Sequence, residues 1–166
     1  IVSFSADFLG TWISPEEFTR QYVSNRNNKA LESKKMSRHI QFEAGMSLTG
    51  SNADTRIPIK PSEEGVALLN LYSEITGTTL PGTAPLGNKA AANAVKVVAK
   101  ELLAAKGRAL VVAGSNDVAT QVLVNAINAA LGSYGTIIDL DNVSNKYAGN
   151  DAEFIDFINE MKSGEE

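Results

Sequence analysis

Short apolar runs alternate with longer helical patterns along this chain, and that alternation constrains the fold more than any other feature. The clearest run is ALVVA at 109–113, which is apolar at every position, as expected for a parallel strand covered on both faces. Further strands are expected at 1–5, 40–43 and 136–140, and a second extended run precedes Pro61. Strands that alternate with helices pair in parallel through right-handed crossovers. The pattern therefore predicts an α/β fold, a Rossmann-like three-layer sandwich with a mainly parallel sheet of about four strands.

Five helices are expected between and after these strands, and each has a start signal, a stop signal or an apolar face. Their expected ranges are 14–23, 62–77, 89–106, 117–132 and 151–161. Ser14, Ser62, Asp117 and Asp151 are the expected N-terminal caps, and Gly77, Gly107 and Gly132 the stops.

Three apolar faces are predicted on these helices. In 89–106 the face consists of Ala91, Val95, Val98, Ala99, Leu102 and Leu103. In 117–132 it consists of Val118, Val122, Ile127 and Leu131, and in the last helix of Phe154, Ile155, Ile158 and Met161. The polar stretch 25–37 predicts a mobile loop, and 77–88, with two prolines and three glycines, predicts a linker or lid.

Composition excludes several kinds of site. The chain contains no cysteine, so it can form no disulfide, no thiolate zinc site and no iron–sulfur cluster. His39 is its single histidine, so any metal would have to be bound by carboxylates alone. The net charge is −4 and the basic residues are scattered, which gives no footprint for nucleic acid.

Length and hydrophobicity indicate one domain. A chain of 166 residues with 43% hydrophobic residues has enough apolar side chains for a core of its own. No apolar run approaches the roughly 20 residues that cross a bilayer, so no direct membrane insertion is predicted. The chain opens on the strand-like run IVSFSADFLG without an initiator methionine or a signal peptide. We therefore expect residues 1–166 to be a single α/β domain excised from a larger protein.

The region from His39 to Pro61 is the first candidate for a ligand site. It reads as a buried strand ending at Glu43, a turn rich in hydroxyls and amides, and an extended run. In open α/β sheets, ligands bind beyond the carboxyl ends of the strands. The alternative is an ordinary surface loop closed by Asx and Ser/Thr turns, and residue types alone favour that alternative.

The turn after ALVVAG is the second candidate, because a helix N-terminus offers free amides to a phosphate. Asp117 lies in this turn, where its carboxylate would cap the helix and repel a phosphate. The turn also lacks both the G-x-G-x-x-G pattern and the lysine of a phosphate-binding loop. We therefore interpret Asp117 as a structural cap.

Catalysis is not indicated by the remaining polar residues. Four acids could gather at the carboxyl ends of strands, and a pair of them could serve acid–base chemistry: Asp7, Glu43, Asp139 and Asp141. Acids at strand ends are also common helix caps, and no serine has a partnering histidine motif. We interpret His39 as a surface or packing residue, whereas the sequence leaves open whether Trp12 is an anchor or a core residue.

Three stretches carry a resemblance to a known family: IVSFSADFLG at 1–10, HIQFEAGMSLTGSNADTRIPIKPSEEG at 39–65, and GRALVVAGSNDVATQVLVNAINAALGSYGTIID at 107–139. Together they resemble the nucleotide-binding α/β domain of the molybdopterin oxidoreductase family. The likeness is closer to the molybdopterin-like iron–sulfur subunits of alternative complex III, a quinol-oxidising respiratory assembly, and it covers nearly the whole chain.

The resemblance implies a set of cofactor-binding positions. Glu43 falls where the family has an aspartate that would meet a ribose, and Ser47 and Thr49 match a hydroxyl pair. Asp54 matches the aspartate of an alanine-aspartate that closes the loop, and Glu64, after Pro61, falls on the aspartate that would meet guanine.

The chain departs from the family pattern where a phosphate would lie. Gly45 replaces the family's arginine, Asp7 lies in the Ser5–Phe8 segment that replaces a G-x-N-P turn, and Ser62 replaces a glycine. A lost cation and a gained carboxylate change the local charge by about two units, each worth on the order of 1 kcal/mol or more. A dianionic cofactor would be held poorly.

Two functions follow from this resemblance as expectations. The first is a domain that binds no cofactor and is not itself catalytic, and that serves as scaffold and docking part of a membrane-associated respiratory electron-transfer complex. Its iron–sulfur clusters would lie elsewhere in the full-length protein, its partners would be other domains and subunits of the complex, and its location would be periplasmic. The second is a working molybdenum oxidoreductase domain that holds molybdopterin guanine dinucleotide through Glu43, Ser47, Thr49, Asp54 and Glu64. A third class, a free-standing module that binds a nucleotide or an acyl carrier, fits the fold but not the abrupt start.

Overall fold

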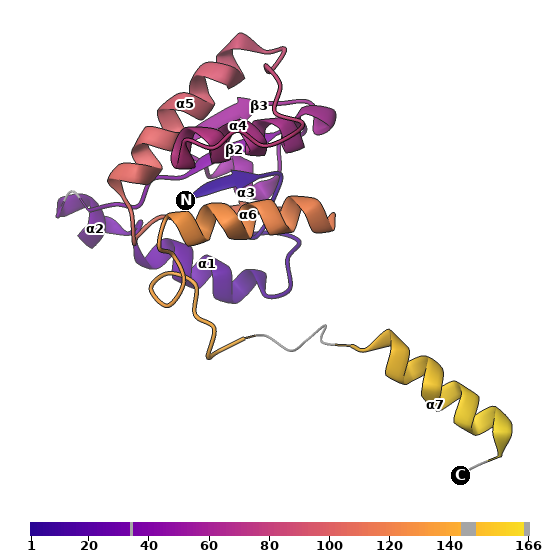
Figure 1. The fold of residues 1–166 in the computed structure, drawn as a ribbon. Coiled ribbons are helices and arrows are strands. Elements are labelled where there is room, and N and C mark those ends of the chain that lie inside the picture. Colours follow the sequence, from indigo (N-terminus) through magenta and orange to yellow (C-terminus); the bar gives the residue numbers. More distant parts are fainter. Residues whose placement is uncertain (34, 144–148, 165–166) are drawn as a thin grey trace.

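The sheet is parallel throughout and contains four strands (Figure 1). A computed structural model describes residues 1–33, 35–143 and 149–164. The strands lie in the order β3-β2-β1-β4, where β1 is Val2–Phe4, β2 Ile40–Glu43, β3 Thr55–Pro58 and β4 Val111–Ala113. The predicted α/β fold with a parallel sheet is confirmed, and it agrees with a Rossmann-like three-layer arrangement.

Helices cover both faces of this sheet. The helical segments of the described residues are α1 (Pro15–Ser24), α2 (Asn28–Glu32), α3 (Leu48–Ser51), the 3₁₀ turn η1 (Pro61–Glu63), α4 (Glu64–Thr76), α5 (Lys89–Ala104), α6 (Val118–Ala130) and α7 (Asp151–Ser163). In Figure 1, α4, α5 and α6 lie on one side of the strands and α1 on the other. This arrangement forms the three layers.

The main core lies between the sheet and α4, α5 and α6, and it is apolar. Phe4 and Phe42 are opposite each other in neighbouring strands and stack with ring centroids 4.7 Å apart. Leu68 and Leu71 of α4 and Ile127 of α6 pack in the same buried cluster. A smaller cluster on the other face contains Ala6, Phe8, Leu9 and Tyr22, with Trp12 and Phe18 against it. Trp12 therefore belongs to an aromatic cluster, edge to face with Phe8 and Phe18.

The expected strand at 136–140 is wrong. Only an isolated bridge joins Tyr134 to Ile138, because the amides of Ile137 and Ile138 both donate to the carbonyl of Ser133 in a tight turn, each at 2.9 Å. The fourth strand is instead the extended run at 55–58. The stretch 25–37 contains the short helix α2, which Asn27 caps by accepting from the amide of Ala30.

The helix ranges were predicted better than their faces. On α5 five of the six expected residues are buried, but Leu103 is 40% exposed. On the helix of α6 the expected Ile127 and Leu131 are buried, but Val118 and Val122 are exposed. Val124 and Asn128 face inward in their place. Asn150 rather than Asp151 caps α7, and Glu63 rather than Ser62 precedes α4.

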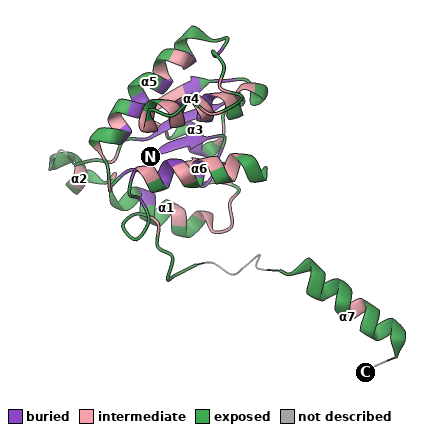
Figure 2. Ribbon diagram, viewed as in Figure 1, coloured by how far each residue is buried: buried purple, intermediate pink, exposed green. Residues whose placement is uncertain are grey.

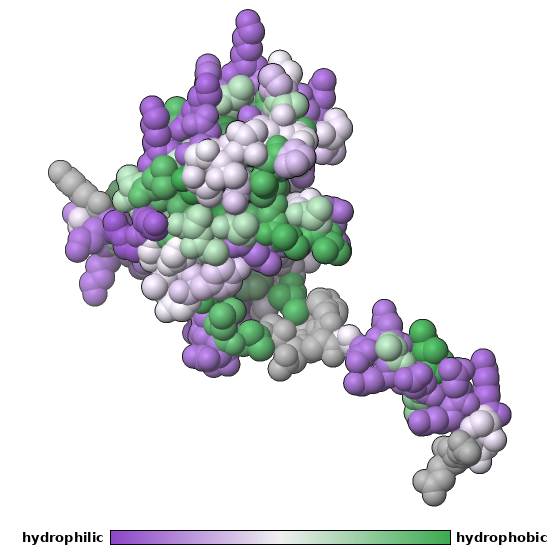
Figure 3. Space-filling model, in the orientation of Figure 1, coloured by the Kyte–Doolittle hydropathy of each residue, from purple (hydrophilic) through white to green (hydrophobic). Residues whose placement is uncertain are grey.

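Helix α7 lies apart from the three layers and its expected apolar face is largely uncovered (Figure 2). Of the expected residues, Phe154, Ile155 and Met161 are more than half exposed and Ile158 is half-buried. The neighbouring Phe157 is also more than half exposed. On the layered part of the molecule, apolar side chains gather in the middle of the view over α4 and α6, whereas the ridge over α5 is hydrophilic (Figure 3). Among the described residues, no helix is both long enough and apolar enough to span a membrane.

Candidate functional site

The predicted ligand loop begins at Glu43, whose carboxylate is buried at the carboxyl end of β2. The residue is only 2% exposed. Its oxygens accept from the hydroxyl of Ser47 at 2.7 Å, the amide of Ser47 at 3.2 Å and the side chain of Gln41 at 3.2 Å. Arg56 of β3 pairs with it through Nε at 2.6 Å. Four groups of the protein therefore surround the carboxylate that the resemblance assigns to a ribose.

These contacts keep Glu43 ionised. Burial alone would raise the pKa of its carboxyl group, but the hydrogen bonds from Ser47 and Arg56 outweigh burial and hold that pKa below its ordinary value. Gly50 gives the carboxylate its space, because a Cβ there would lie 1.9 Å from Oε1 of Glu43. A larger residue at position 50 would therefore displace the Glu43 carboxylate from its present place, through lack of room and not through an unusual backbone angle.

The hydroxyl pair Ser47 and Thr49 is occupied by other groups of the chain. Thr49 donates both its amide and its hydroxyl to Oδ1 of Asp7, at 3.0 and 2.8 Å. The hydroxyl of Ser47, in addition to its bond to Glu43, accepts from the amide of Gly50 at 2.9 Å. The amides of Ser47, Thr49 and Gly50 and the hydroxyls of Ser47 and Thr49 therefore point at two internal carboxylates and one hydroxyl.

Asp54 lies at the other end of β2, away from this cluster. It accepts from the amide of His39, just before the strand begins, at 2.7 Å, and it forms a two-bond pair with Arg26 at 2.8 Å. The hydrogen bond from Arg26 lowers the pKa of Asp54 to about 2, against the opposing effect of burial. The structure thus brings Glu43, Ser47 and Thr49 together but not Asp54.

Glu64 lies in the first turn of α4 and faces the end of β1. Its carboxylate accepts from the hydroxyl of Ser5, a residue with a positive φ of 50°. The backbone also closes tightly here, since a Cβ on Gly114 would lie 2.3 Å from the carbonyl oxygen of Ser5. The strand order reverses between β1 and β4, where open α/β sheets usually form their ligand crevice.

The four acids expected at strand ends do not gather. Asp7 and Glu43 share the Ser47–Gly50 turn, but Asp139 accepts from the amide of Asp141 in an exposed turn of its own. Asp117 caps α6 by accepting from the amide of Thr120 at 2.8 Å, which confirms its structural interpretation. Among the described residues, no group of three histidines, aspartates or glutamates could hold a metal ion.

A buried polar ladder on β2 is the feature that sequence analysis missed. Tyr22 contacts Nδ1 of His39 at 3.2 Å, Nε2 of His39 contacts Gln41 at 3.2 Å, and Gln41 donates to Glu43. Residues 39, 41 and 43 are spaced by two and so share one face of the strand. Their alternation with Ile40 and Phe42 was the available signal. Burial lowers the pKa of His39 to about 4, so the ring is neutral at physiological pH.

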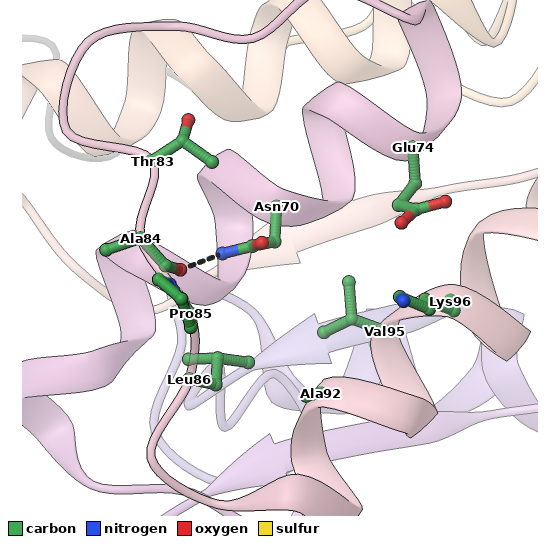
Figure 4. Close-up of a pocket in the computed structure, with 9 residues that line it drawn as sticks. All are labelled: Asn70, Glu74, Thr83, Ala84, Pro85, Leu86, Ala92, Val95 and Lys96. Carbon is green, nitrogen blue, oxygen red and sulfur yellow. Dashed lines mark hydrogen bonds between the residues drawn. The ribbon is translucent and has the colours of Figure 1, made fainter.

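A separate hollow of about 400 Å³ lies between α4, α5 and the segment 77–88 (Figure 4). Asn70 of α4 donates to the carbonyl of Ala84 at 2.8 Å and to that of Val66 at 2.7 Å. These bonds tie the expected lid to α4. Glu74 and Lys96 border the hollow, whose remaining lining is largely apolar.

Comparison of the chain with models of known protein families finds no match, and comparison with curated proteins finds none either.

Proposed function

We propose that this chain is a non-catalytic domain of the molybdopterin oxidoreductase type, which serves as scaffold and docking part of a membrane-associated, quinol-oxidising respiratory complex. The proposal rests on the resemblance of residues 1–10, 39–65 and 107–139 to that family. One observation carries the non-catalytic part of it: the amides of Ser47, Thr49 and Gly50 are occupied by Glu43, Asp7 and the Ser47 hydroxyl.

A phosphate needs free donors, and this turn supplies few. A pyrophosphate that approached it would have to displace Asp7 from Thr49, and Glu43 from Ser47 and Arg56. The displaced carboxylates would lose charge-assisted hydrogen bonds, each worth about 1.5–3 kcal/mol. The residues present therefore fit molybdopterin guanine dinucleotide poorly.

The negative charges of Asp7 and Glu43 also disfavour binding of the dinucleotide's phosphates. Two unit charges of equal sign repel by about 4 kcal/mol at 4 Å near a protein surface. Asp7 and Glu43 would both lie beside the phosphates, and Gly45 supplies no cation in compensation. The guanidinium of Arg56 is already bound to Glu43 and to the carbonyl of Ala44.

In this proposal the redox chemistry belongs to other parts of the assembly. Iron–sulfur clusters would lie elsewhere in the full-length protein, in agreement with a chain that contains no cysteine. The complex would lie at the periplasmic side of a membrane and be held there by partner subunits. The exposed apolar side chains of α7 support a docking role, because exposed apolar patches commonly mark interaction sites.

Titration of the chain with guanosine diphosphate, followed by isothermal titration calorimetry, tests the proposal. We expect no saturable heat up to millimolar nucleotide. The competing function, a working guanine dinucleotide site, requires saturable binding that Glu64→Ala abolishes. Glu74→Ala, an exposed acid on the same helix, is the matched control and should change neither result.

A double substitution provides a positive control for the electrostatic argument. Asp7→Asn with Gly45→Arg removes one carboxylate and restores the cation of the family pattern. This variant should bind guanosine diphosphate more tightly than the wild type. Binding by the wild-type chain that equals or exceeds that of the variant would contradict the proposal.

A further inference from the structure

The outer edge of β4 has no neighbouring strand among the described residues, yet its backbone is not open. Leu110 and Gly114 direct their hydrogen bonds to β1, through the amide of Val2 at 2.8 Å and the carbonyl of Phe4 at 2.9 Å. In a parallel strand, successive residues direct their backbone N–H and C=O groups alternately to the strand on one side and to the strand on the other. Residues 109, 111 and 113 therefore direct their backbone groups away from the sheet.

Side chains of α6 and of the turn after it occupy these outward groups. Asn128 accepts from the amide of Val111 at 2.9 Å and donates to the carbonyl of the same residue at 2.7 Å. Gln121 donates to the carbonyl of Ala113 at 3.1 Å, and the hydroxyl of Ser133 donates to that of Ala109 at 2.8 Å.

Asn128 reproduces the chemistry of a neighbouring strand. Its amide presents one donor and one acceptor to a single residue, as a backbone peptide group does in a ladder. The side chain is almost completely buried, at 2% exposed, within an otherwise apolar helix face. A buried amide on such a face is costly unless both of its groups are bonded, and here both are.

We propose that Asn128, assisted by Gln121 and Ser133, closes the β4 edge against strand addition by a second copy of this chain. The strand that forms this edge, Val111–Ala113, is apolar, and an apolar edge strand can pair with another chain when its backbone groups are left open. A two-fold axis would place it antiparallel to its own copy. The other outer strand, β3, ends at Pro58, which cannot donate a hydrogen bond to an added strand.

The test compares Asn128→Ala with Asn93→Ala, the same substitution on the exposed side of α5. Sedimentation velocity over a wide range of protein concentration should show the mass of Asn128→Ala rising towards twice that of the monomer. The mass of the wild type and that of Asn93→Ala should not rise in this way. Hydrogen exchange should show the Val111 amide of Asn128→Ala exchanging about tenfold or more faster than in the wild type at low concentration. A folded Asn128→Ala variant with wild-type mass at every concentration would overturn the proposal.

Gln121→Ala keeps the test decisive if Asn128→Ala does not fold. On the edge strand it frees the carbonyl of Ala113, and it also frees that of Ser115 in the turn that follows; it removes a half-buried side chain, so the domain should remain intact by circular dichroism. Gln121→Ala should self-associate more than Asn93→Ala, and less than a variant in which all outward backbone groups of β4 are free. If Asn128→Ala is unfolded and Gln121→Ala matches the wild type in mass, the proposal is wrong.

Discussion

Replacing Arg56 by methionine isolates the energetic role of the buried Glu43 carboxylate. The substitution keeps much of the apolar stem but removes the guanidinium, whose Nε lies 2.6 Å from Oε1 of Glu43. The side chain of Glu43 is 3% exposed and that of Arg56 is 26% exposed. Breaking a buried ion pair typically costs about 3–5 kcal/mol, because an uncompensated charge remains inside.

The structure places this case at the lower end of that range. Ser47 and Gln41 still donate to the carboxylate after the substitution, and water reaches part of Arg56. We expect the free energy of unfolding at pH 7, measured by urea denaturation, to fall by about 3 kcal/mol. For a domain of this size that loss corresponds to a decrease in Tm of about 6–12 °C.

The difference in stability between Arg56→Met and the wild type should depend on pH, in a direction set by the pKa of Glu43. In the wild type the pKa of Glu43 is lowered, so its contribution to stability is present above the unfolded pKa of about 4.3. That contribution is lost as the pH falls through the lower folded value. Without Arg56, burial raises the pKa, and the variant's carboxyl becomes protonated at a higher pH than in the wild type. The gap between variant and wild type should therefore narrow as the pH falls from 7 towards about 4.

Arg38→Met is the matched control. Arg38 pairs with Glu101 at 3.2 Å on the surface, where the two side chains are 56% and 36% exposed. An exposed pair of this kind is worth about 0–1 kcal/mol, so this variant should be close to wild type. A loss for Arg56→Met that is below about 1 kcal/mol, or that is unchanged between pH 7 and pH 4, would refute the reasoning.

Three further predictions concern the core and the second polar cluster. Leu102→Ala should lower the free energy of unfolding by about 2–5 kcal/mol in urea denaturation, whereas the partly exposed Leu103→Ala should cost less than about 1 kcal/mol; equal losses would contradict the observed face of α5. The pKa of Asp54 is lowered to about 2, so its contribution, up to about 2 kcal/mol, is present above pH 5 and lost as the pH falls towards 2. Asp54→Asn should flatten that acid limb of the stability curve, and an unchanged limb would count against the Arg26 pair. The pKa of His39 is lowered to about 4, so the unfolded chain binds its proton more readily and stability should fall as the pH drops from about 6.5 to about 4; His39→Gln should remove that slope, and a retained slope would show that another group causes it.

Local patterns predicted most elements because each pattern depends only on nearby residues. The apolar run at 109–113 and the helical spacing of Val95, Val98 and Leu102 needed no long-range information. The prediction of a strand at 136–140 was wrong because the amides of Ile137 and Ile138 donate to the carbonyl of Ser133 in a tight turn. The β-branched composition of this stretch does not reveal that turn. The prediction of the buried face of α6 was partly wrong for a similar reason. Apolar Val118 and Val122 lie outward, while the polar Asn128 faces β4.

Some of the predicted site residues lie together in the structure and others do not. Glu43, Ser47 and Thr49 do form one cluster, as their short spacing in a single turn predicts. Asp54 is only eleven residues from Glu43 but lies at the opposite end of β2, because α3 and its flanking turns carry the chain back to the start of the strand. Whether any of these residues binds a nucleotide stays a prediction for the titration above.

The alternation of strands and helices and the main core residues of α5 could be predicted from the amino-acid sequence, because periodicity encodes them over a few neighbouring residues. The lack of cysteine chemistry follows from composition. Which hydrogen-bond donors are already occupied could be seen only in the folded molecule, because their partners are far apart along the chain. Asp7 binds Thr49 across 42 positions and Asn128 binds Val111 across 17, and no local pattern specifies either contact.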